Sequence, residues 1–159
     1  MNLKKTNAIR EIEKTHFDYN IYTYEVDEND LSAINVAIKT GIDITKIYKT
    51  LALLNEKKEL IIACIPGSDE LDLKKLAKVL HFKKVEMLNL NDLLKNTGYI
   101  RGGCSPIGIK KRHLSIIDNS ALSKDKILIS GGMRGLQLEI VPKDLINYLN
   151  MLTADIIIK

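Results

Sequence analysis

The chain has 159 residues and a mass of 17.9 kDa, a length that fits one domain, 1–159, and leaves little room for a second core. A hydrophobic fraction of 45% and a charged fraction of 28% are ordinary for a globular protein and exclude disorder along most of the chain. The net charge of +4 allows a polyanionic partner but does not require one.

The sequence predicts neither a membrane span nor a disulfide framework. The longest unbroken apolar run, 60–65, is far shorter than the roughly 20 residues that cross a bilayer, and the N-terminus lacks the apolar stretch of a signal peptide. Cys64 and Cys104 allow at most one bridge, and we expect both to be reduced thiols. By elimination, we expect a cytoplasmic protein.

Periodicity and capping residues predict the elements of the first half. In chain order they are a helix at 6–15, a strand at 19–26, a helix at 31–40, paired strands at 49–54 and 59–65, and a helix at 72–80. Thr6 and Asp72 are typical N-caps, and Gly41 is a typical helix stop. One apolar face of helix 31–40 comprises Leu31, Ile34 and Ile38, and the inward face of helix 72–80 comprises Leu73, Leu76, Ala77 and Leu80.

The second half predicts a strand at 85–88, a helix at 90–96, strands at 114–118, 127–130 and 137–141, a helix at 142–151 and a last strand at 155–158. Seven of the nine glycines lie between Gly98 and Gly135. The sum is an α/β protein of the mixed α+β kind, with a partly antiparallel sheet and several helices. The order is too irregular for a doubly wound nucleotide-binding fold.

One segment, residues 98–112, combines glycine with positive charge. Its sequence is Gly-Tyr-Ile-Arg-Gly-Gly-Cys-Ser-Pro-Ile-Gly-Ile-Lys-Lys-Arg. Glycine lets backbone amides approach a ligand, and successive amides form a concave site for an anion or oxyanion. Residues 93–117 contain no acidic side chain and five cations, namely Lys95, Arg101, Lys110, Lys111 and Arg112. The segment should attract a phosphate-bearing partner; the alternative is a solvated turn with a basic rim.

Two phosphate-binding motifs are excluded here. Gly103 and Gly108 have the spacing of the P-loop glycines, but Ile109 stands before Lys110, and Lys111 occupies the place where that motif requires Ser or Thr. The Rossmann fingerprint is missing as well. Any anion site in this segment must therefore be of another kind.

A protein nucleophile and a metal site are also not indicated. Cys104 and Ser105 are flanked by glycines, but a nucleophile needs a base, and the nearest candidate is His113. We interpret Cys104 as a small apolar filler and Ser105 as a residue that orients the loop. No paired ligand spacing is found among Cys64, His81, Cys104 and His113, so we expect no metal.

Two further segments are candidate site elements. Lys49 stands at the start of an apolar strand, where a partly buried ammonium costs free energy unless it is paired; the alternative is an edge-strand lysine that prevents aggregation. Residues 130–135, Ser-Gly-Gly-Met-Arg-Gly, follow a strand and could face segment 98–112 across a pocket. The alternative is a hairpin with a bulge.

Together these segments resemble the YbaK/EbsC family, the YbaK-like prolyl-tRNA editing domains. The ordered matches are Thr23-Tyr24, Tyr48-Lys49-Thr50-Leu51, Leu71-Asp72-Leu73-Lys74-Lys75, Lys84-Val85-Glu86-Met87, Thr97-Gly98-Tyr99, residues 102–111 and residues 130–136. They cover residues 20–154. The resemblance implies one compact α/β domain with a mixed, barrel-like sheet.

The resemblance also implies a function. It indicates a trans-editing hydrolase that deacylates misacylated tRNA, and the member closest in pattern is the Cys-tRNA(Pro) deacylase. In that mechanism the thiol of the substrate cysteine attacks its own ester carbonyl, so the protein supplies only placement and charge stabilisation. The partners implied are mischarged tRNA-Pro and prolyl-tRNA synthetase. We expect no cofactor, and a monomer or weak homodimer.

Roles for individual residues follow from the resemblance. Lys49 matches the lysine on which the family depends, and amides at Gly102 and Gly103 would receive the oxyanion. The residues expected to shape the substrate pocket are Tyr24, Thr50, Ser105, Gly131 and Gly132. From electrostatics alone, we expect contacts to tRNA phosphates from Arg101, Lys110, Lys111 and Arg112.

Two departures from the family pattern bear on specificity. Ser32-Ala33 stand where members commonly have an aromatic residue and glycine, and Cys104 stands where members usually have Val or Ile. Such changes alter binding by about 1–3 kcal/mol. The alternatives are therefore an editing domain for Ala- or Ser-tRNA, or a non-enzymatic module that binds RNA or a protein.

Overall fold

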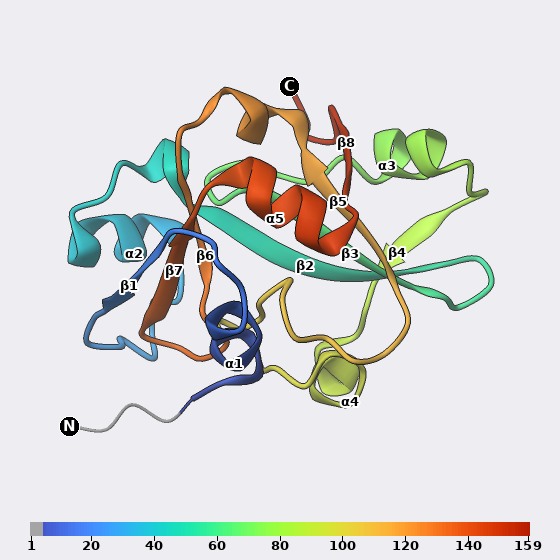
Figure 1. Ribbon diagram of the computed structural model, residues 1–159. Coiled ribbons are helices and arrows are strands. Elements are labelled where there is room, and N and C mark those ends of the chain that lie inside the picture. The colour runs from blue at the N-terminus through green and yellow to red at the C-terminus, as the bar shows by residue number, and fades with distance from the viewer. Residues whose placement is uncertain (1–4) are drawn as a thin grey trace.

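Two β-sheets organise the structure, a computed structural model that describes residues 5–159 (Figure 1). The antiparallel sheet has the order β1-β7-β6, formed by β1 (Tyr19–Thr23), β6 (Ile127–Ser130) and β7 (Leu136–Ile140). The mixed sheet has the order β4-β2-β3-β5-β8, formed by β2 (Tyr48–Asn55), β3 (Leu60–Pro66), β4 (Val85–Met87), β5 (Leu114–Asp118) and β8 (Leu152–Ala154).

The two sheets meet where the chain enters β2. Ile47, the residue before β2, forms a parallel bridge with Leu128 of β6. The described strands do not close into a barrel, but the mixed α/β fold in one domain-sized unit is as the sequence predicts. The bridge places the start of β2 beside the antiparallel sheet, which is where the candidate site lies.

Within residues 5–159, five α-helices lie around the sheets, and two of them have the N-caps that the sequence predicts. The five helices are α1 (Asn7–Glu13), α2 (Ala33–Thr40), α3 (Leu73–Leu80), α4 (Leu93–Thr97) and α5 (Pro142–Leu149). The Thr6 side chain accepts a hydrogen bond from the Ile9 amide at 3.1 Å, and Asp72 caps α3 through the Lys75 amide at 3.1 Å. Every helix within the described range is too short or too polar to cross a membrane.

The core is continuous because the central strand β3 is covered on both faces. All seven of its residues are buried, as is typical of a strand enclosed by layers on both sides. Ile61 and Ile65 pack with Leu76 of α3, whereas Cys64 belongs to a cluster that includes Leu145 of α5. Strand β2, which lines the site, pairs with the buried strand β3 along its length and is held in place by it.

The predicted last strand at 155–158 is wrong. The strand that adds to the sheet is β8, which pairs in parallel with β5, while Ile157 makes only an isolated bridge to Leu71. A side chain explains the difference: Asp118 Oδ1 accepts a hydrogen bond from the Ile156 amide at 3.1 Å. A strand ladder would need that amide for a backbone carbonyl.

One inward-facing assignment needs correction, and two side chains predicted to share a face of α2 are exposed. Leu73 of α3 is 38% exposed, and the apolar face of α2 points to solvent, with Ile34 58% and Ile38 75% exposed. Helix α2 instead buries Val36 and packs closely through small residues, since a Cβ on Gly67 would lie 2.3 Å from the Cβ of Ala33. Close packing, rather than total apolar surface, decided which side of α2 is buried.

Candidate functional site

A cavity of about 400 Å³ lies between the start of β2, the N-terminal end of α2 and the segments on either side of α4. Of the residues that the sequence singles out, the cavity brings together Tyr24, Lys49, Thr50, Arg101 and Gly102. These residues come from three separate parts of the chain. A volume of this size is typical of a pocket for a small molecule or for the end of a larger one.

Lys49 is half-buried in the wall of this cavity. None of the ion pairs within residues 5–159 includes it. Its neighbour Thr50 also lines the cavity and lies 3.5 Å from Cys64, Oγ1 to Sγ. An ammonium held in a pocket wall without an ion-pair partner is available to an anionic or electron-rich ligand group.

The two glycine segments pack directly against each other. A Cβ on Gly103 would lie 2.9 Å from the Cα of Met133, so only glycine allows this approach. Arg134 Nε donates to the Arg101 carbonyl at 2.8 Å, and the Arg134 guanidinium pairs with Glu28. Segment 130–135 faces segment 98–112 as predicted, but the two are in direct contact at these residues and no pocket separates them there; segment 130–135 is also the hairpin turn between β6 and β7.

Of the four glycines predicted to act at the site, Gly102 lines the cavity. The amide of Gly103 is not available for an oxyanion, because it donates to the Ile100 carbonyl at 2.9 Å. The Gly131 amide donates to Leu136 at 2.9 Å, and the Gly132 amide to Ser130 Oγ at 3.1 Å. The amide predicted to receive the oxyanion at Gly103 is therefore already bonded within the described chain, and Gly131 and Gly132 do not line the cavity.

Other predicted site residues lie elsewhere. Ser105 is fully buried, and its hydroxyl accepts a hydrogen bond from the Ile107 amide at 3.3 Å rather than lining the cavity. Arg101 remains at the cavity, but Lys111 and Arg112 line a second cavity, and the exposed Lys110 precedes them. The structure thus divides the basic segment between two places.

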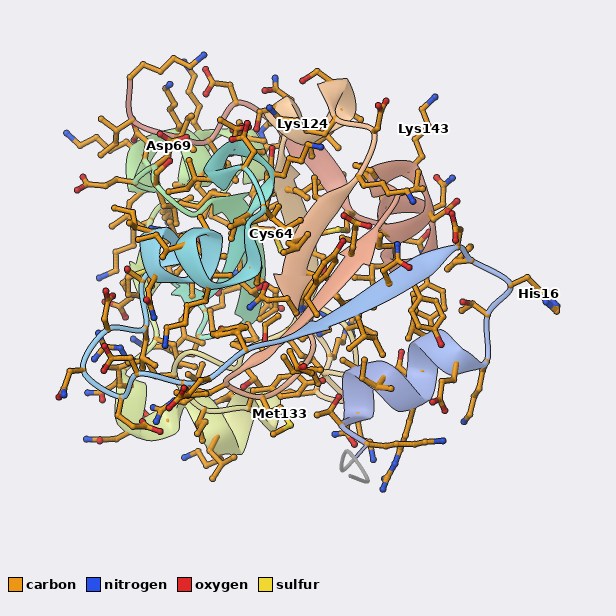
Figure 2. The ribbon with its side chains drawn as sticks, turned by 90° about the vertical axis from the view of Figure 1, so that its left-hand side faces the viewer. His16, Cys64, Asp69, Lys124, Met133 and Lys143 are labelled. Carbon is orange, nitrogen blue, oxygen red and sulfur yellow. The ribbon has the colours of Figure 1, made fainter. Side chains whose placement is uncertain are left out.

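The cysteines near the site are free thiols, as predicted. Cys104 lines the cavity, and burial raises its pKa to about 11; burial also raises the pKa of Cys64 to about 12. Cys64 lies in the interior, near the centre of Figure 2. Both thiols are therefore neutral near pH 7, and the residues that line the cavity include no histidine to activate a nucleophile.

Gln137 is a cavity residue that the sequence analysis missed. It lies on β7, is 6% exposed, and its Oε1 is enclosed without a hydrogen-bond partner in the described chain. It pairs in register with Ser130, which also lines the cavity. Alternation along β7 could have indicated that Gln137 faces away from the core side chains Leu136 and Leu138, but its burial depends on the surrounding elements.

Comparison with known proteins agrees with this geometry. Residues 28–148 match the family model described as "Aminoacyl-tRNA editing domain". The chain is 45% identical over 156 residues to an Enterococcus faecalis protein named "Putative Cys-tRNA(Pro)/Cys-tRNA(Cys) deacylase EbsC", covering 98% of this chain and 95% of that one. It is also 30% identical over 105 residues to a Fervidobacterium nodosum proline–tRNA ligase, covering 66% of this chain and 18% of the ligase.

Solved structures share the fold at low sequence identity. A hypothetical protein superposes with a TM-score of 0.87 at 21% identity, covering 96% of this chain and 99% of the other. A structure described as a "putative trans-editing enzyme for prolyl tRNA synthetase" superposes with a TM-score of 0.80 at 20% identity, covering 96% and 93%. The chain belongs to the family of aminoacyl-tRNA editing domains, as its resemblance predicted, and is an enzyme of the aminoacyl-tRNA deacylase class.

Proposed function

We propose that this protein is a trans-editing hydrolase that removes cysteine from Cys-tRNA(Pro). The name of the Enterococcus faecalis relative supports this substrate at 45% identity over nearly the whole of both chains. The likeness to part of a proline–tRNA ligase supports a link with prolyl-tRNA synthesis, since the mischarged tRNA is a product of that synthetase. Prolyl-tRNA synthetase is accordingly the protein partner we propose.

The cleavage step uses the substrate's own thiol. The sulfur attacks the ester carbonyl, a carbon–sulfur bond forms, and the carbon–oxygen bond to the ribose breaks. The thiol proton passes to the ribose oxygen, and water then opens the cyclic thioester to free cysteine. The protein contributes placement of the reacting atoms and stabilisation of negative charge on the carbonyl oxygen.

One observation carries this proposal: the Lys49 ammonium lies half-buried in the cavity wall, with no carboxylate paired to it in the described chain. It is suited to stabilise developing negative charge, with the backbone at Gly102 on the same cavity. Cys104 is a neutral thiol without an activating histidine in the cavity lining, which supports a nucleophile supplied by the substrate. Tyr24 and Thr50 shape the pocket.

The test is a deacylation assay with Cys-tRNA(Pro), Ala-tRNA(Pro), Ser-tRNA and S-methylcysteinyl-tRNA(Pro). We expect hydrolysis of the first and loss of turnover when the thiol is methylated. Equal hydrolysis of the methylated substrate would contradict the thiol mechanism. Faster hydrolysis of the alanyl or seryl substrate would replace the proposed specificity, and salt-sensitive RNA binding without any turnover would contradict the proposed function.

A further inference from the structure

A second cavity lies at the other end of the β2–β3 hairpin. Its volume is about 430 Å³, and it shares no lining residue with the first. Apolar side chains form part of its lining, and its charged and titratable lining residues are Lys58, Glu59, Lys111, Arg112 and His113. Nothing in the proposed chemistry of the first cavity uses this second one.

The surface around this cavity holds the excess positive charge of the protein. The cavity and its adjoining segments carry seven cations against three carboxylates, a net charge of +4 that equals the net charge of the whole chain. The cations are Lys57, Lys58, Lys83, Lys84, Lys110, Lys111 and Arg112, and the carboxylates are Glu56, Glu59 and Glu86. We call these ten residues the basic face. The remainder of the chain is neutral overall, so a polyanion would be drawn to the basic face.

Most cations of the basic face are not neutralised by carboxylates. Lys58 pairs with Glu86 at 2.9 Å, but Lys110 and Arg112 take part in none of the ion pairs between residues 5 and 159. Lys111 Nζ donates to a neutral amide, Asn96 Oδ1. The N–H donors of the Arg112 guanidinium are therefore available to a ligand. A planar guanidinium binds carboxylate and phosphate groups through two parallel hydrogen bonds.

The basic segment is held in place rather than loose. The Lys111 side chain is bonded to Asn96 in α4, and the His113 ring nitrogen Nδ1 lies 2.7 Å from the Lys111 carbonyl. Because a carbonyl oxygen can only accept, Nδ1 carries the hydrogen in that contact. One bond to α4 and one contact within the segment order it before any ligand arrives, which lowers the entropic cost of binding.

The basic face and the first cavity are joined by one stretch of chain. Arg101 lines the first cavity and Arg112 lines the second, and the connecting segment runs below β2 toward the start of β5 (Figure 1). Along β2, the first cavity extends to Ala52 and the second begins at Asn55, and Lys49 lies six residues, or about 20 Å of strand, from Asn55. A single ligand that reaches both places must be long and must carry several negative charges.

We propose that the basic face binds backbone phosphates of the same tRNA whose aminoacylated 3′ end enters the first cavity. This inference rests on the proposed function, since it takes aminoacyl-tRNA as the substrate. RNA meets both requirements, because it is long and carries one phosphate per nucleotide. Contacts of this kind position the substrate without reading its sequence, so they favour tRNA over a small ester but do not select one tRNA from another.

The test compares two substrates, Cys-tRNA(Pro) and cysteinyl-adenosine, which carries the same ester but no phosphate. In the double variant Lys110→Ala, Arg112→Ala we expect kcat/KM for the tRNA to fall about tenfold at low salt, through KM, and kcat/KM for the small ester to stay unchanged. The slope of log affinity against log salt should flatten by about 2. A second double variant, Lys110→Ala, Arg112→Lys, keeps the charge at position 112 and should lose less activity on the tRNA than Lys110→Ala, Arg112→Ala.

The matched control removes the same two charges at a distance. Lys124 and Lys143, both labelled in Figure 2, line neither cavity and do not belong to the basic face, so Lys124→Ala, Lys143→Ala should leave both substrates unaffected. Binding of tRNA without an attached amino acid is measured in parallel, so that the basic face is tested even if no ester is hydrolysed. Unchanged tRNA affinity and salt slope in the Lys110→Ala, Arg112→Ala variant would overturn the inference, as would equal losses in the control.

Discussion

Two buried amide side chains, Asn55 and Gln137, differ in how far the fold satisfies their polar atoms. Asn55 is 1% exposed and fully bonded: its Nδ2 donates to Glu59 Oε1 at 3.0 Å, and its Oδ1 accepts from the amides of Lys57 and Glu59, both at 2.9 Å. Gln137 is nearly as buried, yet its Oε1 has no partner in the described chain.

Hydrogen bonding within the chain distinguishes polar groups that stabilise the fold from polar groups that remain available to a ligand. An unpaired buried amide costs roughly 1–3 kcal/mol, so it persists only where something offsets the loss. Gln137 and Lys49 both line the first cavity and both lack such partners, whereas Asn55 shapes the turn between β2 and β3. The following predictions test this contrast in order of decreasing effect.

Lys49→Ala should give the largest change. Loss of an electrostatic stabiliser of the transition state lowers the rate about 10²–10³-fold, and we expect this fall in single-turnover hydrolysis of Cys-tRNA(Pro). The free energy of unfolding should hardly change, because Lys49 forms no ion pair in the described chain. Full activity in a folded Lys49→Ala protein would remove this residue from the mechanism.

Asn55→Leu should affect stability alone. The change leaves the amides of Lys57 and Glu59 without their acceptor, in a turn where Lys58 has a φ of 63°. We expect the free energy of unfolding to fall by about 2 kcal/mol, as measured by urea denaturation. Hydrolysis of cysteinyl-adenosine by the folded fraction should be unchanged, and a selective loss of that activity would break the contrast with Gln137.

The buried thiols extend the contrast to pH. Their pKa values are raised from 9.0 to about 12 for Cys64 and about 11 for Cys104, mainly by burial, so the unfolded chain releases these protons first. The stability that they provide is complete below pH 9 and is lost as pH rises toward the folded-state values. The free energy of unfolding should decrease by up to about 1.4 kcal/mol per pH unit per thiol above pH 9.

The measurement is urea denaturation at pH 8, 9 and 10 for the wild type and for a Cys64→Val, Cys104→Ala variant. The variant should lose most of the slope, although its stability at pH 8 will be lower because both side chains are in the core. An identical slope in both proteins would assign the pH dependence to other groups.

Gln137→Leu should change stability less than Asn55→Leu and with the opposite sign. Replacing an unpaired buried amide with an apolar side chain should raise the free energy of unfolding by up to about 1 kcal/mol. We also expect KM for Cys-tRNA(Pro) to rise several-fold, since the cavity loses a hydrogen-bond acceptor. A clear decrease in stability would show that Gln137 is bonded within the folded protein after all.

Much of the fold could be predicted because it depends on local patterns. Several features depend only on residues close together in sequence. They are the caps at Thr6 and Asp72, the left-handed helix end at Gly41, and the apolar strands on either side of the β2–β3 turn. Strand β5 and strand β6 have the predicted bounds. The error at 155–158 arises from a contact with the distant residue Asp118, and the buried side of α2 depends on close packing against the distant residue Gly67.

The sequence by itself determined the family, the mixed α/β class and the candidate lysine, because ordered motifs and hydrophobic periodicity are properties of the chain. Only the tertiary structure decided which candidates meet. In the folded protein, Tyr24, Lys49 and Gly102 line one cavity, whereas Arg112 lines a second one. The Gly103 amide donates a hydrogen bond to the Ile100 carbonyl. The physical reason is that access to a ligand depends on which donors the fold has already used and which side chains it leaves unpaired.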